Sequence, residues 1–395
     1  MKKPVKGSVS WVGRIDWELR KFHGSEYSTW RGTSYNSYVI DEDKVALIET
    51  VWRPYAKEYV DELDRDIGLD RIDYVVANHG ETDHSGALPE LLGRRPGLPV
   101  FCTANGAKSL KGHYHKDWDF RTVKTGDRLS LGRKELIFVE APLLHWPDSM
   151  MCYLTGEEIL FSSDAFGQHY ATELLFNDLV DRAELYGEAV KYYANILAPF
   201  SALVTKKIDE IAAMGLPLDM ICPSHGVIWR SEPFQIVRQY AEWAKSYQED
   251  RIVIAYDTMW EGTRRLAEAV ARGIAEASPA TAIVLHNCSR SDKNDVITDV
   301  FRAKAVLFGS PTVNRGILTS MAGLLEMIRG LKLRGKKAGS FGCYGWSGES
   351  VAVLAEAARG AGFEIQGEGL KALWDPDREA SEEAVEYGRS FARAL

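Results

Sequence analysis

The sequence contains few cysteines, and they are scattered along the chain. There are five in 395 residues, an odd number, and no two of them form a C-x-x-C pair. This absence excludes an attached iron module built from C-x-x-C pairs and gives no support for a disulfide framework. The cysteines are Cys102, Cys152, Cys222, Cys288 and Cys343.

Long runs of basic residues and of apolar residues are also absent. No run of five or more basic residues occurs, and the formal net charge of -8 opposes binding to a phosphate backbone. We therefore expect no nucleic-acid partner. No stretch approaches the roughly 18 apolar residues of a membrane span, and no apolar segment follows the basic residues of MKKPVKGSVSWVGRIDW. We expect no membrane partner and a cytoplasmic location.

The length of the chain predicts two domains, because single hydrophobic cores stop growing at about 250–300 residues. Apolar residues make up 45% of the chain, which is enough for two cores. The pattern of the sequence changes near the polar stretch AKSYQEDR. We expect one domain over residues 1–249 and a second over residues 250–395.

The two halves predict different α/β architectures. From about Ser8 to Leu160, short β runs such as KVALIET and KELIFVEAPLLH are interrupted by occasional helices, and a helical block follows at about 181–214. This predicts a sandwich of mixed sheets with helices outside. Beyond residue 251, strands alternate with helices of about 10–15 residues, which is typical of βαβ units on a doubly wound parallel sheet.

The run His79-Gly80-Glu81-Thr82-Asp83-His84 follows the apolar strand DYVVAN and precedes a helix. Four potential metal ligands fall within these six residues. In a loop, side chains 79, 81 and 83 can point the same way, while Asp83 and His84 diverge enough to serve a second ion. The run therefore indicates a dinuclear site. The alternative is a polar loop that merely caps the helix.

Three further potential ligands stand at the ends of apolar strands. His145 ends LIFVEAPLLH, Asp164 ends EEILFSSD and His225 follows MICPS. Taken singly, each is better explained as a satisfied histidine or a helix-starting aspartate. Their joint occurrence with the first run favours a metal site at one edge of a sheet.

These potential ligands and the segments around them resemble those of a known family. The H-x-E-x-D-H run with its later His, Asp and His is similar to the flavodiiron proteins (A-type flavoproteins), as are LLHWPDSM, DAFGQ and CPSHGVIWR. The resemblance spans essentially the whole chain and implies a metallo-β-lactamase-like αββα sandwich followed by a flavodoxin-like domain. It assigns one iron to His79, Glu81 and His145. It assigns the other to Asp83, His84 and His225, with Asp164 as the bridge.

Glu81 distinguishes this sequence from the zinc hydrolases of the lactamase superfamily, which usually have H-x-H-x-D-H. A carboxylate in place of the middle imidazole makes the ligand set harder and more anionic, which favours iron with open positions. Zinc tolerates carboxylates, so a dizinc hydrolase with an appended flavodoxin domain is the alternative.

The remaining histidines and one tyrosine are not expected to bind metal. His23, in KFHGSEYST, and Tyr193 are candidates for side chains that hydrogen-bond to the ligands and orient them. The other histidines are expected on the surface or in structural roles. They are His113, His115, His169 and His286.

Three loops follow strands of the predicted parallel sheet, and such loops meet where mononucleotides bind. Loop 257–263 is rich in hydroxyl groups and opens a helix, so it can bind a phosphate. Loop 342–348 is rich in glycine, which lets the backbone approach a planar ring that Trp346 can stack on. The expected cofactor-binding residues are Thr258, Met259, Trp260, Glu261, Gly262, Thr263, Ser310, Pro311, Thr312, Val313, Asn314, Gly316, Tyr344, Gly345, Trp346, Ser347 and Gly348.

Each loop taken alone can be explained as a helix cap or a tight turn. Neither G-x-G-x-x-G nor G-K-[ST] occurs in them, which argues against a dinucleotide or a Walker loop. Together the three loops resemble the FMN site of flavodoxins. Gly262 departs from that pattern, because serine or threonine is more usual there; Thr258 and Thr263 remain.

The resemblance implies an oxidoreductase. Electrons would pass from an external donor through FMN to the two irons, which reduce dioxygen to water, nitric oxide to nitrous oxide, or both. The sequence carries no rubredoxin or flavin-reductase module, so we expect a separate donor, with rubredoxin as the first candidate. In this family the cofactors approach each other across a head-to-tail dimer, so we expect a homodimer or a dimer of dimers. A non-enzymatic electron carrier is a second alternative, which seven assembled ligands disfavour.

Overall fold

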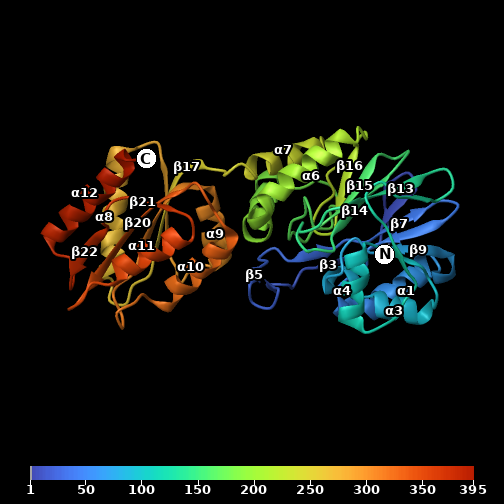
Figure 1. Cartoon of the computed structure of the whole chain (residues 1–395), viewed down its shortest axis with the longest axis horizontal. Coiled ribbons are helices and arrows are strands. Elements are labelled where there is room, and N and C mark those ends of the chain that lie inside the picture. The colour runs from blue at the N-terminus through green and yellow to red at the C-terminus, as the bar shows by residue number, and fades with distance from the viewer. Residues whose placement is uncertain (1) are drawn as a thin grey trace. The chain divides into compact units, whose positions relative to one another are not determined.

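The chain, described for residues 2–395 in a computed structural model, divides into two compact units (Figure 1). The first unit contains the residues up to Tyr192 together with Phe200–Glu242. The second contains Tyr193–Pro199 together with Trp243–Leu395. The domain limits expected from the sequence, 1–249 and 250–395, stay a prediction.

The first unit is built on two β-sheets that share one core. The larger sheet has the order β1-β2-β7-β8-β9-β10-β11, and the smaller has the order β12-β13-β14-β15-β16. Ile40 and Ile48 of the larger sheet are buried in one cluster with Phe138, Cys152 and Phe161 of the smaller. This is the arrangement of a sandwich, in which the inner faces interdigitate.

The strands of the larger sheet are β1 (Lys3–Lys6), β2 (Val9–Trp11), β7 (Tyr38–Asp41), β8 (Val45–Ile48), β9 (Ile72–Val76), β10 (Val100–Cys102) and β11 (Phe120–Thr122). Those of the smaller sheet are β12 (Arg128–Ser130), β13 (Glu135–Glu140), β14 (Met150–Leu154), β15 (Ile159–Ser163) and β16 (Met220–Pro223). Two short antiparallel sheets of two strands each are formed by β3 (Arg14–Asp16) with β6 (Thr33–Tyr35) and by β4 (Lys21–Phe22) with β5 (Tyr27–Ser28).

Helices cover the outer faces of this sandwich. On the smaller sheet, Ile208 and Ile211 of α6 and Val237 of α7 face Val139 and Leu160. Helices α1, α3 and α4 lie beside the larger sheet (Figure 1). The helical segments are η1 (Arg53–Tyr55), α1 (Ala56–Asp66), η2 (Leu69–Arg71), α2 (Thr82–Ser85), α3 (Leu88–Arg94), α4 (Ala104–Tyr114), α5 (Arg182–Tyr192), η4 (Ala198–Phe200), α6 (Ser201–Ala213) and α7 (Phe234–Trp243). The expected αββα sandwich is confirmed.

The second unit is a parallel sheet with helices on its faces. The strand order is β18-β17-β19-β20-β21, with β22 also paired to β20, and every pairing is parallel. In chain order this is 2-1-3-4-5, the flavodoxin-like order, whose switch point lies between its first and third strands. The expected doubly wound sheet is therefore confirmed.

The strands of this sheet are β17 (Glu249–Tyr256), β18 (Ala282–Asn287), β19 (Ala303–Gly309), β20 (Lys337–Tyr344), β21 (Glu364–Ile365) and β22 (Leu370–Leu373). The helices are η3 (Tyr193–Leu197), α8 (Gly262–Ala277), α9 (Lys293–Arg302), α10 (Thr319–Leu331), α11 (Ser350–Gly360) and α12 (Arg378–Arg393).

Two glycines allow α8 and α12 to pack closely. A Cβ atom at Gly273 would lie 1.9 Å from the carbonyl oxygen of Val385, and one at Gly388 would lie 2.1 Å from that of Val270. No side chain can occupy either position at this separation. The contact therefore depends on the absence of a methyl group on both helices.

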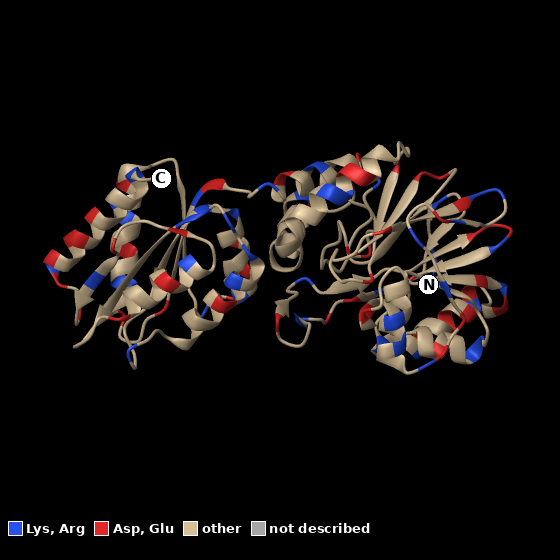
Figure 2. Cartoon of the chain, in the orientation of Figure 1, with Lys and Arg blue, Asp and Glu red and all other residues tan. Residues whose placement is uncertain are grey.

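Charged residues of both signs are interspersed on the helices of both units (Figure 2). Mixed charge of this kind is typical of faces exposed to solvent. Within residues 2–395, no helix combines the length and the apolar character needed to cross a membrane.

Replacing Gly273 by alanine is expected to destabilise the second unit by about 1–3 kcal/mol, because the added methyl group overpacks the contact between α8 and α12. Gly323→Ala in α10 is the matched control, because its Cβ would meet no atom within 4 Å and alanine favours a helix. Urea unfolding of the full chain, with hydrogen exchange of the α8 amides, measures both effects. Equal stability of the two variants would contradict the close contact.

Candidate metal centre and mononucleotide pocket

The seven expected metal ligands come together at one edge of the sandwich. They stand after β9, β13, β15 and β16, so four strand ends converge on one site. Five of them are at most 4% exposed, and Glu81 and His145 are little more so. The ligands are His79, Glu81, Asp83, His84, His145, Asp164 and His225.

Three of these residues form a first group around one oxygen of Asp164. The Nε2 atoms of His79 and His145 lie 3.3 and 3.5 Å from Oε2 of Glu81. The same two nitrogens lie 3.5 and 3.3 Å from Oδ2 of Asp164. Two imidazoles and two carboxylates thus point at one small volume, which we call the first subsite.

A second group surrounds the other oxygen of the same aspartate. Oδ1 of Asp164 lies 3.1 Å from Nε2 of His84 and 3.5 Å from Nε2 of His225. Oδ2 of Asp83 lies 3.2 and 3.0 Å from these nitrogens. This is the second subsite. Asp164 therefore presents one oxygen to each subsite, which is the geometry of a carboxylate that bridges two ions.

The donor atoms fit metal ions better than they fit one another. Among residues 2–395, both carboxylate oxygens of Asp83, Nε2 of His84 and Oδ2 of Asp164 are buried and make no hydrogen bond. Burying such groups unpaired is costly. Four imidazoles and three carboxylates supply the mixed nitrogen and oxygen set that iron accepts.

The protonation equilibria point to a local excess of negative charge. Burial disfavours the charged form of His79, but hydrogen bonds to Asp148 and Glu81 outweigh burial and raise its pKa to about 10. Burial raises the pKa of Asp164, yet the nearby His84 and His145 hold that pKa well below its usual range. A bound cation would neutralise this charge in place of the protons.

Groups behind the ligands fix the orientation of three imidazoles. Nδ1 of His79 lies 3.1 Å from Oδ1 of Asp148, and Nδ1 of His84 lies 2.8 Å from Oε2 of Glu49. Nδ1 of His225 lies 2.6 Å from the carbonyl oxygen of Ser34. Each acceptor requires a proton on Nδ1 and so leaves Nε2 free to bind a metal.

Sequence reasoning missed Glu49 and Asp148. Asp148 lies within the segment LLHWPDSM that carried the family resemblance, so its position gave a signal. Glu49 lies in no motif. Only its short distance from His84 in the structure shows that it supports a ligand.

The two expected supporting residues have different outcomes. His23 is brought to the site, with its Nε2 3.1 Å from Oε1 of Glu81. Tyr193 instead belongs to the second unit, where its ring packs on Trp243 and Phe301. The neighbouring Tyr192 lies where Tyr193 was expected. Its hydroxyl donates a hydrogen bond to Oδ1 of Asp164 over 3.1 Å. The error is one residue, which on a helix is a rotation of about 100°.

Of the other histidines, His169 lies nearest to the metal centre. It is buried, its Nδ1 lies 2.8 Å from the hydroxyl of Thr33, and its ring centroid lies 4.9 Å from that of His225. His113 stacks on Trp146, whose ring contacts His79 edge-on. The expectation of surface or structural roles for these histidines stays a prediction.

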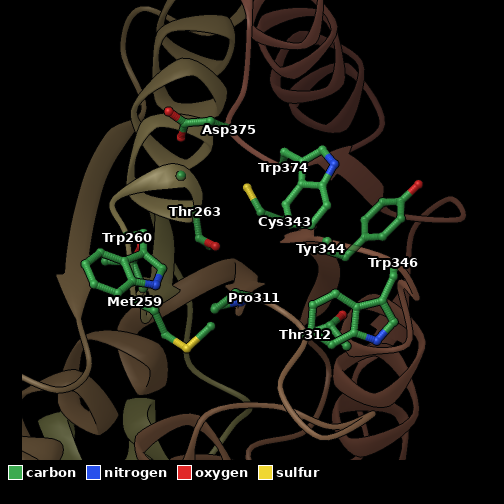
Figure 3. Close-up of a pocket in the computed structure, with 13 residues that line it drawn as sticks. Met259, Trp260, Thr263, Pro311, Thr312, Cys343, Tyr344, Trp346, Trp374 and Asp375 are labelled. Carbon is green, nitrogen blue, oxygen red and sulfur yellow. The ribbon is translucent and has the colours of Figure 1, made fainter.

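The second unit has a cavity of about 470 Å³ at the carboxyl ends of its strands (Figure 3). Its walls come from the segments after β17, β19, β20 and β22, and its volume is in the range of small-molecule sites. The hydroxyl of Thr258 lines this cavity and is buried without a hydrogen bond, so it is available to a phosphate. The lining residues are Thr258, Met259, Trp260, Gly262, Thr263, Pro311, Thr312, Cys343, Tyr344, Gly345, Trp346, Trp374 and Asp375.

Large aromatic side chains surround this cavity. Trp260 and Trp346 are each 87% exposed, and the rings of Trp346 and Trp374 have centroids 6.5 Å apart. Figure 3 shows Trp260 and Trp346 on opposite sides of the opening. Flat apolar walls with a hydroxyl-rich base fit a planar ring that carries a phosphate, as FMN does.

Ten of the expected cofactor-binding residues line the cavity, and seven do not. Ser310 is buried and binds the backbone of its own loop, and Val313 and Gly316 close a tight turn. The residues outside the lining are Glu261, Ser310, Val313, Asn314, Gly316, Ser347 and Gly348. Three lining residues were not expected. Cys343 lies within loop 342–348, whereas Trp374 and Asp375 follow β22, and only the loops after three other strands were considered.

Gly262, where a hydroxyl residue was expected, has a steric reason. A Cβ atom there would lie 3.1 Å from Sγ of Cys343 and 3.4 Å from Cδ of Pro376. A larger residue would crowd the sulfur of Cys343, which lines the cavity. Thr258 and Thr263 both line the cavity, and their hydroxyl groups are buried without a hydrogen bond.

Family models match both units. Residues 33–226 match the ODP family beta lactamase model, and residues 254–388 match the flavodoxin model. The two matches fall on the sandwich and on the parallel sheet respectively. They confirm the fold class expected for each half.

Individual proteins match over nearly the whole chain. An anaerobic nitric oxide reductase flavorubredoxin of Escherichia coli O1:K1 is 54% identical over 391 residues, which are 98% of this chain and 81% of the relative. The structure of a rubredoxin oxygen:oxidoreductase from Desulfovibrio gigas superposes with a TM-score of 0.96 at 36% identity, covering 100% of this chain and 98% of that one. The flavodiiron protein of Giardia intestinalis gives 0.94 at 34% identity, with 100% and 96% covered. By these matches and by its ligand set, the chain belongs to the flavodiiron protein family.

Proposed function

We propose that this protein is an oxidoreductase that passes electrons from an external donor through FMN to a non-haem diiron site. That site reduces nitric oxide to nitrous oxide, dioxygen to water, or both. The observation that carries the proposal is Asp164, whose two oxygens face two ligand groups of mixed histidine and carboxylate character. The dizinc hydrolase is not proposed, because Glu81 makes the first subsite more anionic than the hydrolase pattern.

Two cofactors would supply the redox chemistry. Iron held by the seven ligands would supply one-electron steps and would bind and activate a diatomic molecule. FMN held in the cavity of the second unit exchanges electrons singly or in pairs. The protein's part is to hold both groups, to set their surroundings and to supply protons.

Side chains of this chain can hold protons beside the first-unit site. Either reduction consumes as many protons as electrons, because the oxygen removed from two nitric oxides leaves as one water and both oxygens of dioxygen leave as two waters. Tyr192 carries a hydroxyl proton on Oδ1 of Asp164. His23, about one-third exposed, carries a ring nitrogen 3.1 Å from Oε1 of Glu81 and so lies between the ligands and solvent.

The partners remain proposals. We propose a rubredoxin-type protein as electron donor, which the names of two of the relatives support. We also propose a head-to-tail homodimer or a dimer of dimers. The exposed Trp260, Trp346 and Met259 around the cavity support an interface there, because exposed aromatic patches mark contact sites. The cytoplasmic location stays a prediction.

The function is tested by anaerobic consumption kinetics on protein of measured iron and FMN content. The same reduced rubredoxin is used as electron donor with each gas. The protein is expected to consume nitric oxide or dioxygen rapidly, with one nitrous oxide formed for every two nitric oxides. A preparation that holds two zinc ions per chain and cleaves esters without a reductant would contradict the proposal. So would fully loaded protein that stays reduced in the presence of both gases.

Glu81→His is expected to shift the first subsite from iron toward zinc, because it restores the imidazole of the hydrolase pattern. Chains expressed with both metals available should contain less iron and more zinc than wild type, and their reductase activity should fall at least tenfold. Elemental analysis and gas consumption measure the two effects. Glu58→His, at an exposed glutamate of α1, is the control and should change neither.

Trp346→Ala is expected to weaken FMN binding about 2-fold to 10-fold, because an aromatic contact contributes about 0.5–1.5 kcal/mol. Titration of flavin-free protein with FMN, followed by the loss of flavin fluorescence, gives the dissociation constant. Trp17→Ala removes a tryptophan that is 52% exposed in the first unit and should leave FMN binding unchanged. The proposed cavity would be the wrong site if both variants bound FMN as wild type does.

A further inference from the structure

Glu49 is a buried carboxylate that stands directly after β8 and points at the second subsite. It is 2% exposed. Its Oε2 lies 2.8 Å from Nδ1 of His84 and accepts a hydrogen bond from Ser224 over 2.8 Å. Its Oε1 accepts one from Ser163 over 3.2 Å. Three side chains therefore satisfy one carboxylate.

Each of these contacts reaches a ligand of the second subsite. His84 is itself a ligand, Ser163 directly precedes Asp164, and Ser224 directly precedes His225. Glu49 thus connects three strand-end segments that are 35, 114 and 175 residues away in sequence. Glu49 is not itself one of the seven ligands.

The backbone around Glu49 is arranged for this contact. Its φ angle is 59°, a left-handed conformation that is strained for a glutamate. Its amide donates to Val76 over 2.8 Å, and its carbonyl accepts from the hydroxyl of Ser37 over 2.9 Å. The next residue, Thr50, donates its amide and its hydroxyl to the carbonyl oxygen of His84 over 2.8 and 2.7 Å. Residues 49 and 50 therefore hold both the ring and the backbone of His84.

Asp148 makes the equivalent contact in the first subsite, and only there. Its carboxylate contacts Nδ1 of His79 and accepts a hydrogen bond from the amide of Gly80 over 3.0 Å. Each subsite thus has one imidazole backed by its own buried carboxylate, while His225 is backed by a neutral carbonyl. The two carboxylates provide a matched pair for comparison.

We propose that Glu49 is the positioning residue of the second subsite, where it fixes His84 as a ligand and lowers the reduction potential of the iron held there. The inference rests on the diiron site of the proposed function. It adds that a different carboxylate sets the reduction potential of each iron. An anionic partner on Nδ1 makes the imidazole a stronger electron donor, which favours the more oxidised metal. The charge of Glu49 acts on the second iron, and that of Asp148 acts on the first.

Glu49→Gln tests this inference, because it removes the charge and keeps an acceptor oxygen for His84. We expect the second iron to shift about tenfold toward its reduced form, which is about 59 mV for a one-electron couple. Asp148→Asn should shift the first iron instead. The two variants should therefore change the separation between the two one-electron potentials in opposite directions. Redox titration followed by electron paramagnetic resonance measures this separation in the holoprotein.

Metal retention gives a second readout. Glu49→Ala should lose one iron per chain to a chelator about 10-fold to 100-fold more readily than wild type and keep the other, which Mössbauer spectroscopy resolves. Glu157→Gln is the control, because Glu157 is equally buried but pairs with Ser8 and Lys134. It should change stability without changing either potential.

The outcomes separate this inference from the proposed function. Wild-type protein without two redox-active irons would overturn the proposed function and the inference with it. Two irons in wild type, with Glu49→Gln and Asp148→Asn shifting the potentials alike or not at all, would overturn the inference alone. If the Glu49 variants do not fold, Ser224→Ala removes one hydrogen bond and keeps the carboxylate. Unchanged retention of the second iron in that variant would also overturn the inference.

Discussion

The two oxygens of the Asp164 carboxylate set the constraint on which the first unit depends. One oxygen faces His79 and His145, and the other faces His84 and His225. Both can be satisfied only if the ends of strands in two different sheets stay in fixed register. The shared core supplies this, because close-packed interiors resist sliding by even a fraction of a side chain. Ligand geometry in this unit therefore depends on core packing, and a loss of packing would disturb both subsites.

The second unit meets a different requirement, which is to hold a planar ring and a phosphate in one open cavity. Parallel strands bring four segments to one edge of the sheet. Glycines in these segments let the walls of the cavity lie close together, because they carry no side chain. A Cβ atom at Gly345, for example, would lie 2.6 Å from the ring of Trp374. The metal centre is closed and anionic, whereas this cavity is open and aromatic. The contrast suits ions that stay in place and a flavin that must exchange electrons at the surface.

The parts of this molecule that could be predicted from the sequence are those encoded locally. The run from His79 to His84 could be predicted to bind metal, because its ligands are neighbours in sequence and follow an apolar strand. The alternation of strands and helices likewise gave the doubly wound sheet. Glu49 could not be predicted, because its role depends on contacts with segments 114 and 175 residues away. Tyr193 was chosen in place of Tyr192 because sequence pattern does not fix the rotation of α5 to a single residue.

One consequence of Glu49 concerns how the chain can vary in length. The turn between β7 and β8 contains the exposed residues Asp43 and Lys44, and the Lys44 side chain pairs with Asp73 over 3.0 Å. Yet β8 is only four residues long and ends directly before Glu49. An insertion or deletion in this turn that shifted β8 by one residue against its neighbours would turn the buried side chains of β8 to the opposite face and carry Glu49 away from His84. The number of residues in this surface turn is therefore constrained by a carboxylate that lies beside the metal centre.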